Sequence, residues 1–129
     1  ISVGLGYGDN FRSVFVAQSM REMEYFLDKV VPRRRNLLAS AYLGDTLVTA
    51  YSPYSRNRTF GVMIGKGYTV AAAKLELNMV AEGYYATNAL KAIAHERHLE
   101  MPILETAYRI LYDKISPAIE MHLLAEGLS

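Results

Sequence analysis

A short stretch between residues 43 and 58 carries most of the side chains in this sequence that could do chemistry together. A single acid, Asp45, stands in a run of apolar and hydroxyl-bearing residues. A Ser-Pro turn follows, and after it comes a polar cluster that consists of Ser55, Arg56, Asn57 and Arg58. Guanidinium groups bind phosphate oxygens through charge-assisted, often bidentate hydrogen bonds, and amides and hydroxyls add further donors. The stretch therefore predicts a site for a small anionic, hydroxylated ligand.

Each of these residues also has a purely structural interpretation. Asp45 would be favoured near the start of a helix by the helix dipole. Arg56 and Arg58 could form a solvated pair, an interpretation that we keep for Arg58 but not for Arg56. Asn57 could cap the next helix, a role that is compatible with ligand binding.

The elements that must position these side chains are helices. Over residues 11–31 apolar side chains recur at three- and four-residue steps, the period of an amphipathic helix. The predicted buried stripe of this helix consists of Val16, Met20, Met23, Leu27 and Val30. Further helices are predicted over residues 36–42, 45–51, 56–65, 70–77, 83–97, 101–113 and 117–126. No stretch shows the period-two alternation of a strand, so the sequence predicts a single all-α, bundle-like domain of seven or eight helices.

Local signals mark the ends of several of these helices. Pro32 ends the first, because proline lacks an amide donor and clashes with the preceding turn. Gly65 closes the helix over 56–65, and Thr69 is expected to cap the next one. For the helix over 83–97, the predicted buried face consists of Tyr84, Ala86, Leu90 and Ile93.

Composition restricts the class of protein. The 129 residues are 51% hydrophobic and 21% charged, which is typical of one globular domain. The sequence has no cysteine, which excludes disulfides and thiolate chemistry, and its net charge of +1 gives no reason to expect a nucleic acid. Its apolar runs are far shorter than the ~18 residues that a membrane-spanning helix needs. The arginine run at 33–35 is interpreted as a solvated helix end.

Two further motifs depart from known ligand-binding spacings. The glycines within residues 4–8 follow a G-x-G-x-G pattern, whereas a dinucleotide loop needs G-x-G-x-x-G after a strand. We interpret them as a flexible entry into the first helix, with Asp9 or Asn10 as its N-cap. His95 and His98 fall one residue short of the H-E-x-x-H zinc motif, and no metal site is expected.

Several motifs, taken in order, resemble a known family. They are Gly8-Asp9-Asn10, Leu43-Gly44-Asp45, the segment 52–58, Val80-Ala81-Glu82-Gly83 and Met101-Pro102-Ile103. Their order and spacing resemble the C-terminal domain of bacterial-type NAD(P)-dependent glycerol-3-phosphate dehydrogenase over nearly all 129 residues. The resemblance implies a fold like the helical C-terminal domain of 6-phosphogluconate dehydrogenase. The chain opens abruptly on Ile1, so we expect a fragment of a longer protein. The resemblance implies that residues 1–129 are the substrate-binding and dimerisation domain, without the Rossmann domain.

The resemblance also implies an activity. The family interconverts sn-glycerol 3-phosphate and dihydroxyacetone phosphate with NAD or NADP, and in bacteria it feeds glycerophospholipid synthesis. The implied protein is a cytoplasmic homodimer whose N-terminal domain makes most of the nucleotide contacts. Neither a nucleic-acid partner nor membrane insertion is expected.

Roles carry over to the residues that match the family's motifs. Asp45 would lie beside the reacting end of the substrate, near the catalytic lysine, and Thr49 would share its helix face at i+4. The substrate would be held by Ser55, Arg56 and Asn57, of which Arg56 and Asn57 would face its phosphate.

The resemblance implies nucleotide contacts as well, from Arg56, Val80 and Glu82. The family's catalytic lysine would lie before Ile1, and no lysine in this sequence matches its motif. We therefore expect the 129-residue chain alone to be inactive, because hydride transfer needs cofactor and substrate held in contact. The alternative is a non-catalytic helical dimerisation or interaction module, in which the Arg-Asn-Arg segment is only a helix start.

Overall fold

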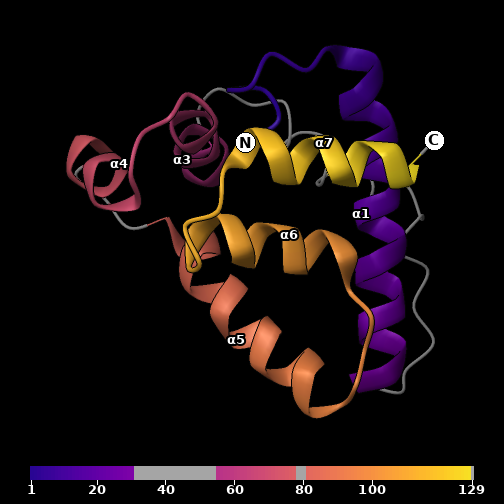
Figure 1. The fold of residues 1–129 in the computed structure, drawn as a ribbon. Helices are drawn as coiled ribbons and strands as arrows, with labels where there is room; N and C mark the ends of the chain where they lie inside the picture. Colours follow the sequence, from indigo (N-terminus) through magenta and orange to yellow (C-terminus); the bar gives the residue numbers. More distant parts are fainter. Residues whose placement is uncertain (31–54, 78–80, 129) are drawn as a thin grey trace.

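The structure, a computed structural model, describes residues 1–30, 55–77 and 81–128 of the chain. Within these ranges there are six helices and no strand, which confirms the all-α prediction. The helices are α1 (Asp9–Val30), α3 (Arg56–Gly65), α4 (Val70–Leu77), α5 (Glu82–Glu96), α6 (Pro102–Leu111) and α7 (Pro117–Leu128) (Figure 1). The short helices predicted over 36–42 and 45–51 lie outside the described residues.

The helices pack mainly on α3, α6 and α7, and α1 lies along one side and contacts α7. In Figure 1, α1 stands along one side of the molecule, while α6 and α7 run across toward it. Helix α5 packs on α6, α6 on α7, and α3 on α4. Helix α3 also contacts α5 and α7. The start of α3 can therefore meet the start of α5, although more than twenty residues of sequence separate them.

Helix α1 begins two residues earlier than predicted and is buried along a different stripe. Val16 and Met20 are buried as expected, but Met23 is 46% exposed and Phe26 takes its place in the core. The predicted N-cap is also wrong, because Asp9 and Asn10 both lie inside the helix and the Gly8 carbonyl accepts the hydrogen bond from the Arg12 N–H. The helical period was sufficient to predict α1. Which of its stripes is buried depends on the helices that pack against it, and the period does not specify these helices.

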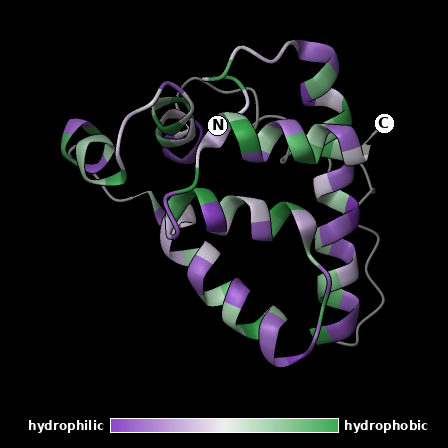
Figure 2. Ribbon diagram, viewed as in Figure 1, coloured by the Kyte–Doolittle hydropathy of each residue, from purple (hydrophilic) through white to green (hydrophobic). Residues whose placement is uncertain are grey.

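The main hydrophobic core gathers around α3. Phe60 and Ile64 of α3 are almost fully buried against Ala73 of α4, Ile110 of α6 and Met121 of α7. A second cluster joins α1 to the end of α5 and the residue before α6, and consists of Phe26, Ala94 and Met101. Figure 2 shows hydrophobic and hydrophilic residues alternating along the helices, as amphipathic helices require.

The buried face predicted for α5 is largely wrong. Ala94 is the buried residue of this helix, whereas Ala86 and Leu90 are exposed. Tyr84 and Ile93 are half-buried. The predictions for α3 and α4 are confirmed in both bounds, and the Thr69 hydroxyl accepts the Ala72 N–H at 3.1 Å as the expected cap.

The glycine-rich start of the chain packs against α3. The Leu5 N–H donates to the Ile1 carbonyl at 3.1 Å, which closes a turn. A Cβ atom on Gly4 would collide with the Val62 carbonyl, and one on Gly65 would collide with the Ile1 carbonyl. These glycines permit a close crossing of two backbone segments, so they have a packing role beyond the flexible entry that was predicted.

Among the described residues, no helix combines the length and the apolar character that a membrane crossing would require.

Candidate functional site

The first turn of α3 is built around Ser55. Its backbone is extended, with φ −68° and ψ 124°, and its Oγ accepts the Arg58 N–H at 3.2 Å. Ser55 is therefore the N-cap of α3, and its hydroxyl hydrogen stays available for a ligand. The first turn contains no acid. Unpaired N–H groups and the positive end of the helix dipole favour an anion at such a position.

Asn57 bridges the start of α3 to the start of α5. Its Oδ1 accepts the Gly83 N–H at 3.0 Å, across 26 residues of sequence. Helix α5 has Ala81 as its N-cap, with no side-chain cap hydrogen bond of its own. Asn57 thus does cap a helix, but that helix is α5 and not the α3 in which it lies.

The bridge brings together the predicted site residues that the structure describes. Arg56 precedes Asn57 in α3, and Glu82 precedes Gly83 in α5. The side chains of Arg56 and Glu82 are both exposed. Cationic, amide and hydroxyl groups are therefore carried by the start of one helix and a carboxylate by the start of the other, and the Asn57–Gly83 hydrogen bond joins the two helix starts. The predicted residues Asp45, Thr49 and Val80 lie outside the described residues, so their roles stay predictions.

Arg58 is not the solvated cation that was predicted. The residue is only partly exposed, and its Nε atom is buried without a hydrogen-bond partner in the described part of the chain. Arg56, by contrast, is exposed at the helix start. Arg56 is therefore the better candidate for contact with a ligand.

A stack of tyrosines holds the start of α5. Tyr84, which follows Gly83, stacks on Tyr112 with ring centroids 4.5 Å apart, and Tyr108 continues the stack at 5.0 Å. The Tyr112 hydroxyl donates to the Tyr84 carbonyl at 2.5 Å. Burial raises the pKa of the Tyr112 hydroxyl above its ordinary value, so the hydroxyl stays protonated and remains a hydrogen-bond donor. Lys74 Nζ covers the other side of Tyr84, 4.0 Å from the ring centroid.

Gly83 is a residue of the site that the sequence named within a family motif but to which no role was assigned. Its role depends on a contact with Asn57, and spacing along the chain cannot reveal a contact across 26 residues. One signal was present, because glycine in a helix is ~1 kcal/mol less favourable than alanine and so indicates a special requirement. Gly83 occupies the second position of α5.

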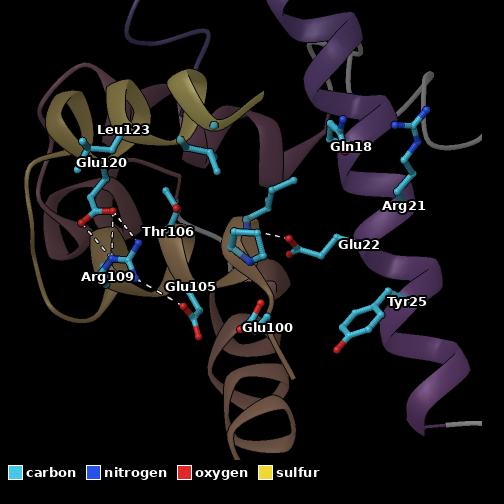
Figure 3. Close-up of a pocket in the computed structure, with 14 residues that line it drawn as sticks. Gln18, Arg21, Glu22, Tyr25, Glu100, Glu105, Thr106, Arg109, Glu120 and Leu123 are labelled. Atoms are coloured by element: carbon cyan, nitrogen blue, oxygen red, sulfur yellow. Dashed lines mark hydrogen bonds and ion pairs between the residues drawn. The ribbon is translucent and has the colours of Figure 1, made fainter. Parts of the chain in front are cut away.

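A cavity of about 640 Å³ lies elsewhere, between α1, α6 and α7. Figure 3 shows its polar side chains, three of which, Glu22, Arg109 and Glu120, join one segment of the chain to another. Arg109 of α6 lies 3.0 Å from Glu120 of α7 and 3.8 Å from Glu105. The Ile103 and Leu104 N–H groups each donate to Glu22 at 2.9 Å. None of the four described site residues lines this cavity, so we do not assign it to the predicted ligand.

Glu22 provides a pH-dependent contribution to stability. Burial raises the pKa of its carboxyl above the ordinary value of 4.5, although the Ile103 and Leu104 N–H groups favour the ionised form. The folded chain therefore keeps this proton to a higher pH than the unfolded chain.

We predict that the contribution of Glu22 to the free energy of unfolding falls as the pH rises from about 4.5 through its raised pKa. Glu22→Gln removes the titrating group and should flatten this part of the profile. Urea unfolding of both proteins at several pH values measures the effect. An identical slope in the variant would show that Glu22 does not cause it.

His95 and His98, whose spacing falls one residue short of the zinc motif, lie at the end of α5. His95 lies in the last turn and His98 follows it with φ 55°, and both are exposed. Across the ranges that the structure covers, no group of three or more metal-binding side chains is placed to hold an ion.

Comparison with known proteins identifies relatives of this chain. The family model described as NAD-dependent glycerol-3-phosphate dehydrogenase C-terminus matches residues 1–122. Glycerol-3-phosphate dehydrogenase [NAD(P)+] from Staphylococcus aureus strain JH9 is 35% identical over 116 residues, which are 90% of this chain and 35% of that protein. The enzyme of strain USA300 gives the same identity and coverage.

A solved structure agrees with these sequence matches. The 2.1 Å crystal structure of glycerol-3-phosphate dehydrogenase from Coxiella burnetii superposes with a TM-score of 0.91 at 30% sequence identity. The match covers 97% of this chain and 38% of that one. The chain thus spans between about a third and two fifths of the length of these relatives.

Proposed function

The chain belongs to the family of NAD-dependent glycerol-3-phosphate dehydrogenase C-terminal domains, and we propose that it forms the substrate-binding half of such an enzyme's active site. The reaction is the interconversion of sn-glycerol 3-phosphate and dihydroxyacetone phosphate. The observation that carries this proposal is the hydrogen bond between Asn57 and Gly83. This hydrogen bond joins the starts of α3 and α5. The start of α3 carries the Ser55 hydroxyl and the exposed Arg56 guanidinium, and α5 begins with the exposed Glu82 carboxylate.

The phosphate end of the substrate is assigned to the start of α3. Arg56 supplies a guanidinium that can bind two phosphate oxygens, while Asn57 and Ser55 supply further donors. The first turn of α3 contains no acid that would repel the phosphate. We assign the reacting end of the substrate to Asp45 and Thr49, because the segment in which they lie resembles the family's motif.

The nucleotide is assigned to Arg56, Val80 and Glu82, together with a nucleotide-binding domain and a catalytic lysine outside this chain. The donor set fits a nucleotide, because an exposed guanidinium suits a pyrophosphate and an exposed carboxylate can accept from hydroxyl groups. NAD or NADP, which the relatives' names indicate, supplies or accepts the hydride when bound. The residues of this chain orient the substrate beside it.

The assembly and cellular role follow the family. We propose that residues 1–129 form one substrate-binding and dimerisation domain of a cytoplasmic homodimer, and that its product enters glycerophospholipid synthesis. Two exposed apolar side chains one turn apart on α7, Ile119 at 60% and Leu123 at 58%, support a contact with a second copy.

The decisive experiment uses this chain joined to its nucleotide-binding domain. We expect NADH or NADPH to be consumed when dihydroxyacetone phosphate is added, and no consumption with the isolated 129-residue chain. A folded full-length protein without turnover would contradict the enzyme assignment. It would instead favour the non-catalytic interaction module.

A further inference from the structure

The side-chain amide of Asn57 has an acceptor end, Oδ1, and a donor end, Nδ2, and in the structure Oδ1 already accepts a hydrogen bond. A backbone N–H can only meet an acceptor, so the Gly83 N–H fixes the Oδ1 end of the amide at 3.0 Å. The Nδ2 end has no hydrogen-bond partner among the described residues, and Asn57 is exposed. The exposed face of this side chain is therefore a donor.

The lack of a side chain at Gly83 leaves room for the Asn57 amide at this contact. A Cβ atom at Gly83 would lie 3.0 Å from Asn57 Oδ1 and 3.1 Å from its Cγ, tighter than ordinary van der Waals contacts. Gly83 does not have a positive φ, so its backbone conformation does not explain the glycine. Alanine would also be the better helix former. The three atoms that would lie nearest to a Cβ at Gly83 all belong to the Asn57 amide group.

We propose that Gly83 is a positioning residue for the substrate's phosphate. Its N–H and its missing side chain hold the Asn57 amide so that Nδ2 points to the ligand. A phosphate dianion presents only acceptor oxygens, so an amide turned the other way would repel it. This inference rests on the proposed function, in which Asn57 contacts the phosphate.

The test compares two glycine substitutions in the full-length enzyme. Gly83→Ala keeps the N–H but adds the crowding Cβ, whereas a Cβ at Gly127 of α7 would meet nothing within 4 Å. The readouts are kcat and KM for dihydroxyacetone phosphate, and the inhibition constant of inorganic phosphate as a competitive probe. Thermal unfolding of each variant monitors the fold.

We expect Gly83→Ala to raise both the KM and the phosphate inhibition constant by about tenfold or more, the loss of one hydrogen bond to a charged group. Its kcat should stay within about threefold, because only a binding contact is lost. Gly127→Ala should leave all three values unchanged. A purely structural role would lower kcat and thermal stability without a selective loss of phosphate binding.

A double-mutant cycle separates this inference from the proposed function. If Gly83 acts through Asn57, Gly83→Ala should add less than about a twofold effect in an Asn57→Ala background. Multiplicative effects of the two substitutions would overturn the inference. The inference would also be overturned if Asn57→Ala weakened phosphate binding while Gly83→Ala left it unchanged. If Asn57→Ala itself leaves phosphate binding unchanged, the assignment of the phosphate to Asn57 fails, and the inference fails with it.

Discussion

Arg56→Ala is expected to lower kcat/KM for dihydroxyacetone phosphate at least about tenfold in the full-length enzyme. The exposed guanidinium at the start of α3 is the cation proposed to bind the phosphate. A hydrogen bond to a charged group contributes ~1.5–3 kcal/mol, and 1.4 kcal/mol corresponds to a factor of about ten. Steady-state kinetics with varied substrate measures the loss, and most of it should lie in KM if the contact holds ground state and transition state equally.

Arg21→Ala is the matched control for this substitution. Arg21 is also exposed, but it lies on α1 beside the cavity that no described site residue lines. Both variants lose one positive charge, so a general electrostatic effect would appear in both. Equal and small losses, within about threefold, would show that Arg56 does not bind the phosphate.

Phe60→Ala is expected to reduce the free energy of unfolding by ~3–5 kcal/mol. Phe60 is 4% exposed in the main core, and its ring makes a T-shaped contact with Tyr84 at a centroid distance of 6.0 Å. The substitution removes buried apolar area and leaves a cavity between α3 and α5. Urea unfolding followed by circular dichroism measures the change, and Phe60→Leu should lose less because it fills part of the space.

The control for the core substitution is Leu75→Ala on α4. Leu75 is 81% exposed, so its truncation should change the free energy of unfolding by no more than ~0.5 kcal/mol. A Phe60→Ala variant as stable as Leu75→Ala would mean that α3 is not anchored through this ring. The position of Arg56 and Asn57 would then need another support.

Local sequence signals were sufficient to predict α3, the helix that carries the candidate site. Gly65 ends it as predicted, and this signal acts within a few residues. The N-cap, Ser55, was not among the predicted caps. The family motif then indicated which polar residues of its first turn to consider. Three of the predicted residues, Ser55, Arg56 and Asn57, do lie together there, although their contact with a substrate is still a prediction.

Tertiary contacts were beyond the sequence analysis. Met23 and Leu90 match a helical period but are exposed, because the position of neighbouring helices decides which stripe of an amphipathic helix is buried. The pairing of Asn57 with Gly83 has the same origin. It depends on the packing of α3 against α5, which a periodicity argument does not contain.

The tyrosine stack gives this protein a built-in optical probe. These 129 residues contain ten tyrosines and no tryptophan, so the ultraviolet emission of this part of the protein comes from tyrosine. Near-ultraviolet circular dichroism is sensitive to fixed aromatic packing, and the Tyr84–Tyr112 pair is closely stacked. Because Tyr84 directly follows Gly83, a ligand that orders the start of α5 should alter this signal. Occupancy of the candidate site can thus be followed without a dye or a coupled assay.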